Sequence, residues 1–217
     1  MKAARLLCLV LVLLAAWAPP AAAEWFVDLY LGVASTRSSE IETTFPSGVT
    51  TRENIDWRTN VTLGARGGYW FLKPGWLDAP FDVDIGAAVD VSLFAPAGDT
   101  TVIPISALLM ARVPLLKDED FPQGRLQPYV GFGPGIFVSR VDGGLAGINN
   151  VSDTSVAIGF DFRAGAAFRI TELFSLFAEY RYTHVRPEFS LGVSDGTAKS
   201  TATFNTHHFV TGLGFRF

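Results

Sequence analysis

The sequence predicts an all-β protein, an eight-stranded antiparallel up-and-down transmembrane β-barrel, and three observations lead to this fold class. Segments of about ten residues alternate apolar with small or polar residues, which is typical of strands with two different faces. Mean hydropathy is +0.29 and 49% of residues are hydrophobic, yet after residue 23 no apolar stretch approaches the roughly 18 residues of a spanning helix. Long and short links also tend to alternate, as in outer-membrane barrels.

Residues 1–23 have the pattern of a secretory signal. Lys2 and Arg5 precede an apolar run over residues 6–18, and three alanines at 21–23 provide a small-residue cleavage site. We therefore expect export, cleavage after residue 23, and one barrel domain over residues 24–217. Cys8 would leave with the signal, so the mature chain would have no disulfide, thiol nucleophile or cysteine metal ligand.

The first four predicted strands are defined by their alternation and by the turns that flank them. The third strand is the clearest, because Asp82, Asp84 and Asp90 share one face with small residues while the other face is aliphatic. Carboxylates are costly in lipid, so this polar face must line the lumen. The fourth strand is apolar on both faces and is the least distinct. In chain order these strands cover residues 25–34, 57–71, 81–93 and 101–113.

The last four predicted strands repeat the pattern. The sixth places Asp161 and Arg163 inward, and the seventh places Glu179 and Arg181 inward. The terminal strand alternates aromatic or aliphatic residues with small or polar ones and stops on Phe217. In chain order these strands cover residues 125–139, 158–168, 174–182 and 209–217.

The links between strands indicate how the barrel is oriented. We expect long loops at residues 35–56, 140–155 and 186–199, and short turns elsewhere, the loop at Gly98-Asp99 being an exception to the alternation. Long loops are extracellular in outer-membrane barrels, so both termini are expected to face the periplasm. Aromatic residues gather at the strand ends of that rim, as expected at the headgroup boundary. They are Trp25, Tyr69, Trp70, Phe71, Phe81, Phe168, Phe174, Phe215 and Phe217.

The inward faces collect charges of both signs, which form the candidate functional site. An eight-stranded barrel is just wide enough for its own side chains, so we interpret these charges as structural ion pairs. The alternative is the lining of an ion-selective passage. The predicted lumen network contains Asp28, Arg66, Asp82, Asp84, Asp90, Arg112, Asp161, Arg163, Glu179, Arg181 and Arg216.

Other features do not indicate a catalytic or metal site. Parity places His184 and His207 outward and His208 inward, and nothing in their spacing makes them converge on a metal. The net charge of −4 gives no support for nucleic-acid binding. A soluble lipocalin-like barrel is the rival fold, but the face that would meet water has few of the Lys and Glu residues usual on soluble surfaces.

The sequence resembles the family of small OmpA-like outer-membrane β-barrel proteins. The resemblance is carried by residues 209–217, by Glu-Tyr-Arg-Tyr-Thr at 179–183 and by Tyr-Val-Gly-Phe-Gly-Pro-Gly at 129–135. It implies that the barrel-assembly machinery reads the terminal strand, a role that falls on Phe217 with Phe215 and Leu213 in support. Full-length members carry a peptidoglycan-binding domain that is missing here, which puts a cell-wall tethering role in doubt.

The chain is also similar in architecture to outer-membrane lipid A deacylases, which use a His-x-Ser pair. The residues before His184 look like the approach to that histidine, but Arg186 occupies the serine position. An acyl transfer by a Ser–His pair would then lack its nucleophile. We therefore expect no catalytic residues and no cofactor.

Three functions are compatible with the sequence. The preferred one is a non-enzymatic barrel with an envelope-integrity or surface-interaction role, because loops on a rigid scaffold commonly carry such functions. A small porin-like channel is the alternative, and a lipid A-modifying enzyme is disfavoured by Arg186. The expected partners are outer-membrane lipid, lipopolysaccharide and the assembly machinery, with no nucleic acid, and the chain is expected to be a monomer.

Overall fold

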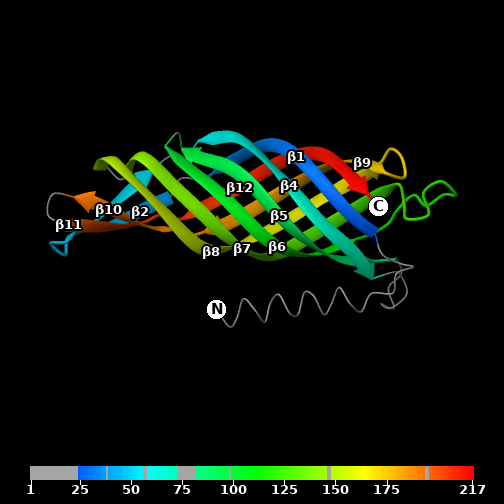
Figure 1. Cartoon of the computed structure of the whole chain (residues 1–217), viewed down its shortest axis with the longest axis horizontal. Helices are drawn as coiled ribbons and strands as arrows, with labels where there is room; N and C mark the ends of the chain where they lie inside the picture. Colours follow the sequence, from blue (N-terminus) through cyan, green and yellow to red (C-terminus); the bar gives the residue numbers. More distant parts are fainter. Residues whose placement is uncertain are drawn as a thin grey trace.

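The computed structural model describes residues 24–37, 39–55, 58–72, 82–97, 99–145, 148–193 and 196–217, and these form twelve β-strands. Eight of them make a closed antiparallel barrel in the order β1-β12-β9-β8-β7-β6-β5-β4 (Figure 1). The predicted fold class is therefore confirmed. The barrel strands are β1 (Glu24–Thr36), β4 (Thr59–Leu72), β5 (Asp84–Ala97), β6 (Thr100–Arg112), β7 (Leu126–Leu145), β8 (Ile148–Arg169), β9 (Phe174–Val185) and β12 (Phe204–Arg216).

Alternating side chains explain how these segments form a membrane barrel. On β1, Leu31 is 63% exposed on the outer wall while Phe26 is 2% exposed in the lumen. The ring closes where β1 pairs with β12, from Phe26 opposite Arg216 to Thr36 opposite Thr206. Closure leaves the barrel strands without a free edge, which lipid could not satisfy.

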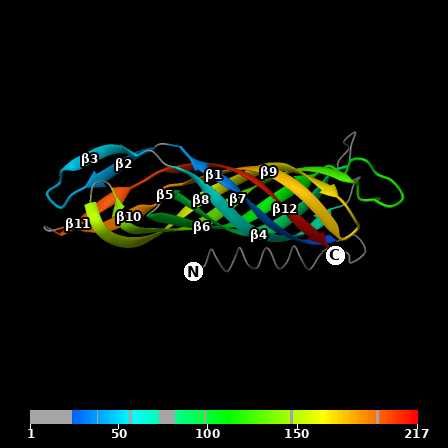
Figure 2. The same ribbon diagram turned by 90° about the horizontal axis from the view of Figure 1, so that it is seen from above.

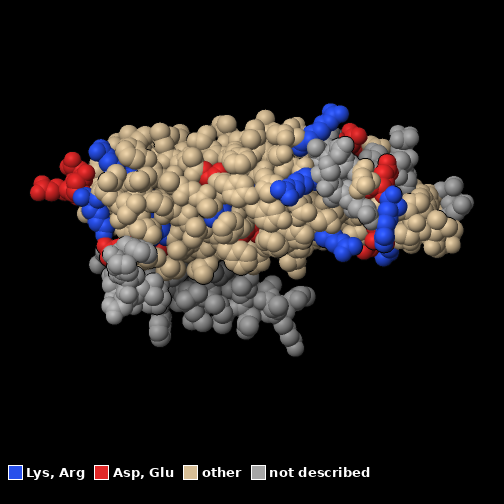
Figure 3. Space-filling view, turned by 180° about the vertical axis from the view of Figure 1, so that it is seen from behind, with Lys and Arg blue, Asp and Glu red and all other residues tan. Residues whose placement is uncertain are grey.

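The outer surface is divided along the long axis of the molecule. Lys, Arg, Asp and Glu gather at the two ends, and the belt between them is largely uncharged (Figure 3). Exposed Val, Leu, Ile and Phe side chains of the barrel strands form this belt, which is the surface expected to face hydrocarbon. No helix of the described residues is long and apolar enough to cross a membrane.

The remaining four strands form a second sheet beyond one end of the barrel, in the order β10-β11-β2-β3. β2 (Ser39–Thr44) and β3 (Thr50–Ile55) come from the first predicted loop, and β10 (Glu188–Val193) and β11 (Gly196–Thr201) from the last. Figure 2 shows both hairpins at that end. These segments are therefore strands where loops were expected, because each hairpin has one buried face: Ile41, Phe189 and Leu191 are fully buried.

The expected loop at residues 140–155 is also wrong. β7 continues to Leu145 and β8 starts at Ile148, with paired residues on both sides. The Gly and Asn content suggested a loop, but a shift in register between Gly143 and Gly144 lets the ladder continue. The long hairpin contacts the second sheet through β10.

Two buried layers fill the barrel along its axis. The layer at the end of the barrel that carries the second sheet is apolar and includes Phe94, Phe137, Phe189, Leu191 and Phe204. Ile41, Phe189 and Leu191 of the second sheet pack into this layer and so cover that end of the barrel. The layer nearer the end where β1 begins and β12 ends contains Phe26, Tyr30, Trp70, Tyr129 and Phe177 and surrounds the buried charges.

Aromatic pairs lie at the end of the barrel where β1 begins and β12 ends. Ring centroids of Trp25 and Tyr69 are 4.7 Å apart, and those of Phe174 and Phe215 are 5.1 Å apart. Trp70 differs from the expectation, since it is buried in the lumen with its ring stacked on Phe26. The predicted signal and Phe81 lie outside the described residues.

Candidate functional site in the lumen

Two fully buried arginines converge on Asp90 at the centre of the lumen. Arg163 Nη1 lies 2.9 Å from Asp90 Oδ2, and Arg181 Nη2 lies 3.2 Å from the same oxygen. The Tyr30 hydroxyl donates to Asp90 at 2.8 Å. Arg163 also donates to Asp161 at 2.5 Å. Inward parity on β1, β5, β8 and β9 brings these side chains together across the lumen, and each charge is compensated inside the barrel.

Arg66 connects this centre to the next layer of charges. It donates to Asp28 Oδ2 at 2.7 Å and to Glu179 Oε2 at 2.6 Å. Tyr129 also donates to Glu179, at 2.8 Å. Arg216 Nη1 reaches the other oxygen of Asp28 at 2.7 Å. The five strands β1, β4, β7, β9 and β12 are thereby joined through the lumen as well as along the wall.

Arg112 organises the layer of charges at the rim where β1 begins and β12 ends. Its side chain contacts Asp84 at 2.8 Å and Glu24 at 2.6 Å, and its guanidinium lies 4.5 Å from the Trp70 ring centroid. Glu24 was missing from the predicted network, although it shares the inward parity of Asp28. Its position beside the predicted cleavage site placed it before the first strand that the sequence indicated.

All the predicted network residues except Asp82 are buried in the lumen. Asp82 precedes β5, whose first residue is Asp84, and its half-exposed carboxylate pairs with Lys117 instead. The alternation in the sequence begins at residue 81, three residues before the first residue of β5. Asp82 belongs to a rim contact and not to the lumen network.

The three histidines do not share one site. His208 is buried beneath the apolar layer, where its Nε2 lies 3.0 Å from the Thr183 hydroxyl and its ring packs edge-on against Phe94. His184 and His207 project from the outer wall and bind Asn205 and Tyr180. Within the described ranges no group of three or more His, Cys, Asp or Glu side chains is arranged to hold a metal.

The second sheet is held on the barrel by polar contacts as well as by its apolar face. The backbone amides of Glu188 and Ser190 donate to Ser155 Oγ and Asp153 Oδ2, at 3.1 and 2.6 Å. Within the β7–β8 hairpin itself, hydrogen bonds from Arg140 and Ser152 to the Asp142 carboxyl lower the pKa of that group. The sheet is thus fixed to the long β7–β8 hairpin.

The predicted assembly residues lie at the end of β12 that carries the chain terminus. Leu213 and Phe217 are exposed on the outer wall, and Phe215 packs against Phe174. The Phe217 amide donates to the Trp25 carbonyl at 3.0 Å. The terminal strand is therefore the one that closes the barrel against β1.

Comparison with known proteins gives the same architecture. The outer membrane protein OprG from Pseudomonas aeruginosa matches with a TM-score of 0.63 at 16% identity, over 90% of this chain and 96% of that chain. AlkL in lipid bilayers has a TM-score of 0.49 at 14% identity, over 90% of each chain. Neisserial surface protein A has a TM-score of 0.46 at 15% identity, over 89% of this chain and 97% of that chain. At these identities the likeness to OprG shows the fold, and the other two carry no further argument.

No curated protein matches the chain. The family model for the outer membrane protein beta-barrel domain matches residues 8–217, which is nearly the whole sequence. Together with the closed barrel and its apolar belt, this match places the protein in the bacterial outer membrane. The chain belongs to the family of outer membrane protein beta-barrel domains.

Proposed function

We propose that the protein is a non-enzymatic outer-membrane barrel with an occluded lumen, which acts in surface interaction or envelope integrity through its extracellular sheet. The observation that carries the proposal is the filling of the lumen by two successive layers, one of ion pairs and one of apolar side chains.

The ion-pair layer supports occlusion because its charged side chains are paired with one another. Asp90, Arg163 and Arg181 are inaccessible to solvent, and each is paired with an opposite charge. A passing ion would have to break such pairs in a region of low dielectric, which is costly. The apolar layer above, with Phe94, Phe137 and Phe204, adds a second barrier that offers no polar ligands.

The extracellular sheet supports a surface role because it is ordered and presents polar side chains. The residues of β3 from Thr50 to Asn54 are exposed, and Lys199 binds Glu188 at 3.1 Å on the surface of β10 and β11. Interaction sites are commonly built on segments that a rigid scaffold holds in place.

A small channel is the second candidate, and one observation favours it. Glu179 Oε1 and Arg181 Nε are buried and have no hydrogen-bond partner within the described part of the chain. Buried polar atoms of this kind are commonly satisfied by water, and a chain of waters is the start of a conducting path. Enzymatic lipid A modification is the third candidate, and Arg186 at the position of the serine argues against it.

Permeability and surface binding separate the first two candidates in cells. The protein is expressed in a Gram-negative strain that lacks its major porins, and uptake of a small zwitterionic solute is measured beside adhesion of the cells to a panel of glycans and matrix proteins. We expect unchanged uptake, and adhesion that disappears when the exposed residues of β3 are replaced by serine. Faster uptake that β3 replacement leaves unaltered would instead establish the channel.

A further inference from the structure

Five tyrosine, histidine and asparagine residues form a hydrogen-bonded cluster on the outer wall, in the half of the barrel nearer the second sheet. They are Tyr180, Tyr182 and His184 on β9 and Asn205 and His207 on β12, and we call them the ring cluster. The Tyr180 hydroxyl lies 2.7 Å from His207 Nδ1. Tyr182 donates to Asn205 Oδ1 at 2.9 Å, and His184 Nδ1 lies 2.7 Å from the same oxygen.

The ring cluster occupies one side of the barrel and is not part of an even girdle. β9 and β5 are four strands apart in the ring of eight, so they lie on opposite walls. On β4, β5 and β6 the exposed side chains of this half include Val61, Leu93 and Ile103, which are aliphatic. A general preference of rings for the interface acts equally all round a barrel. The asymmetry therefore calls for a local cause.

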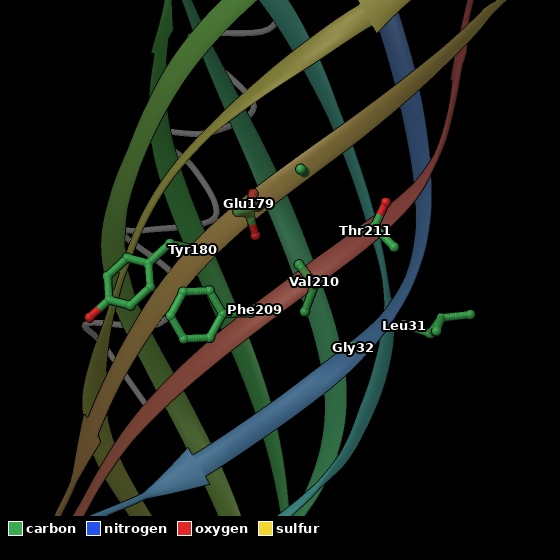
Figure 4. A pocket seen from close by; sticks show the side chains of 8 residues that line it. Leu31, Gly32, Glu179, Tyr180, Phe209, Val210 and Thr211 are labelled. Atoms are coloured by element: carbon green, nitrogen blue, oxygen red, sulfur yellow. The ribbon is translucent and has the colours of Figure 1, made fainter.

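A groove of about 460 Å³ begins beside the ring cluster and runs along the apolar wall. Strand register aligns Leu31 with Thr211 and Thr211 with Ala178, one row below Phe209 and Tyr180. The small side chains of Thr211 and Ala178 leave a hollow between Leu31 on one side and the two rings on the other. Figure 4 shows Tyr180 and Phe209 on one side and Leu31 on the other.

Two exposed arginines lie at the extracellular edge of the same wall. Arg37 follows β1, and its amide donates to the Asn205 carbonyl at 2.9 Å. Arg186 follows β9 directly. Along the wall the order is thus an apolar groove, hydrogen-bonding rings, and then cations.

We propose that this wall binds one lipid of the outer leaflet that carries a phosphorylated sugar headgroup. An acyl chain would occupy the groove beside Ala178, the sugar would meet the ring cluster, and Arg37 and Arg186 would bind phosphate. Arginine is well suited to phosphate because its planar fork donates two parallel bonds. Tyrosine and histidine rings at this depth offer an apolar face and a polar tip to the same ligand. The proposal concerns the outer wall and does not depend on whether the lumen conducts.

The groove is tested with the folded protein in detergent, by native mass spectrometry with purified lipid A, dephosphorylated lipid A or phosphatidylglycerol. We expect lipid A to bind about tenfold more tightly than phosphatidylglycerol, a difference of about 1.4 kcal/mol. Ala178→Leu fills the hollow and should weaken lipid A binding by about tenfold. Ala65→Leu is the matched control, since Ala65 is an exposed wall alanine on β4. It should leave the affinity unchanged.

The headgroup contacts are tested by the double change Arg37→Gln and Arg186→Gln. Arg140→Gln is the control, because Arg140 is exposed on β7, four strands from β1 in the ring of eight. The double variant should bind lipid A as weakly as the wild type binds dephosphorylated lipid A. Heat-dependent gel migration checks that each variant is folded, and Thr211→Leu fills the same groove if Ala178→Leu does not fold. Equal affinity for lipid A and phosphatidylglycerol, or equal losses in test and control variants, would overturn the proposal.

Discussion

At the residue scale, Arg163 balances carboxylates from three strands. It contacts Asp90 on β5, Asp161 on β8 and, at 3.6 Å, Glu179 on β9. Removal of its charge would leave buried carboxylates without full compensation. Buried ion pairs are costly to break for this reason, even where their net contribution to stability is small.

We therefore expect Arg163→Met to lower the free energy of unfolding by about 3–5 kcal/mol. The measurement is urea unfolding of the protein refolded in lipid vesicles, followed by tryptophan fluorescence. Arg140→Met is the control, because the Arg140–Asp142 pair is exposed at the surface and screened by water. A similar loss of unfolding free energy in both variants would show that the buried ion pairs contribute no more to stability than an exposed pair.

Among the described glycines, Gly133 has the closest backbone neighbour to the place that a Cβ atom would occupy. A Cβ atom at this position would lie 1.8 Å from the Ala107 carbonyl oxygen, which belongs to the backbone of β6. We expect Gly133→Ala to lower the free energy of unfolding by about 1–3 kcal/mol. Gly67→Ala, whose new Cβ would meet its nearest atom at 3.9 Å, should be neutral in the same urea titration. An unchanged midpoint for Gly133→Ala would mean that β6 and β7 can separate there.

At the scale of elements, the main structural feature is the sheet formed by the first and last extracellular segments. β11 pairs with β2, and the Thr43 and Ser200 hydroxyls are 3.1 Å apart. This pairing joins segments that are separated by most of the chain. It also places Ile41, Phe189 and Leu191 over the end of the barrel.

Cysteines at positions 43 and 200 should therefore form a disulfide in a protein of residues 24–217, which contains no cysteine of its own. Thr43→Cys with Ser200→Cys is expected to oxidise during refolding and to change migration on a non-reducing gel. Thr51→Cys with Ser200→Cys is the control, because β2 lies between these residues and strands are spaced by about 4.8 Å. Efficient cross-linking of the control pair, or none of the test pair, would contradict the order of this sheet.

The barrel strands could be predicted from the sequence and the extracellular strands could not, for a physical reason. Lipid outside and side chains inside impose a strict period of two, which Trp25 to Val33 or Phe209 to Phe217 show plainly. In residues 39–55 and 188–201 most outward side chains are Ser, Thr or charged, so the segments resemble loops. Their strand character depends on long-range pairing and on burial against Phe94 and Phe204.

The candidate site could be predicted in membership but not in its contacts. The odd or even position of a residue along its strand identifies which charges face the lumen, because successive side chains point to opposite faces. It does not show that Arg163 and Arg181 share Asp90, since that depends on strand order and on the stagger of the closed barrel. Asp82 was assigned wrongly because alternation continues past the point where β5 pairing begins.

At the scale of the whole molecule, the protein is a barrel divided into a charged layer and an apolar layer, with a sheet above. The charges lie at the two ends of the outer surface and inside the lumen, while the belt between is largely uncharged (Figure 3). This distribution fixes the barrel in an outer membrane and leaves the extracellular sheet and the outer wall available to partners. The proposed function depends above all on the occlusion of the lumen.

Ion conductance of refolded residues 24–217 in planar lipid bilayers measures whether the lumen is occluded. Heat-dependent gel migration would first establish that the barrel is folded, and Asp84→Asn and Arg163→Met would be measured beside the wild type. We predict a silent bilayer with no discrete current steps from the wild-type barrel. Steps whose size changes when Asp84 or Arg163 is neutralised would contradict the account and make the charged lumen a pore.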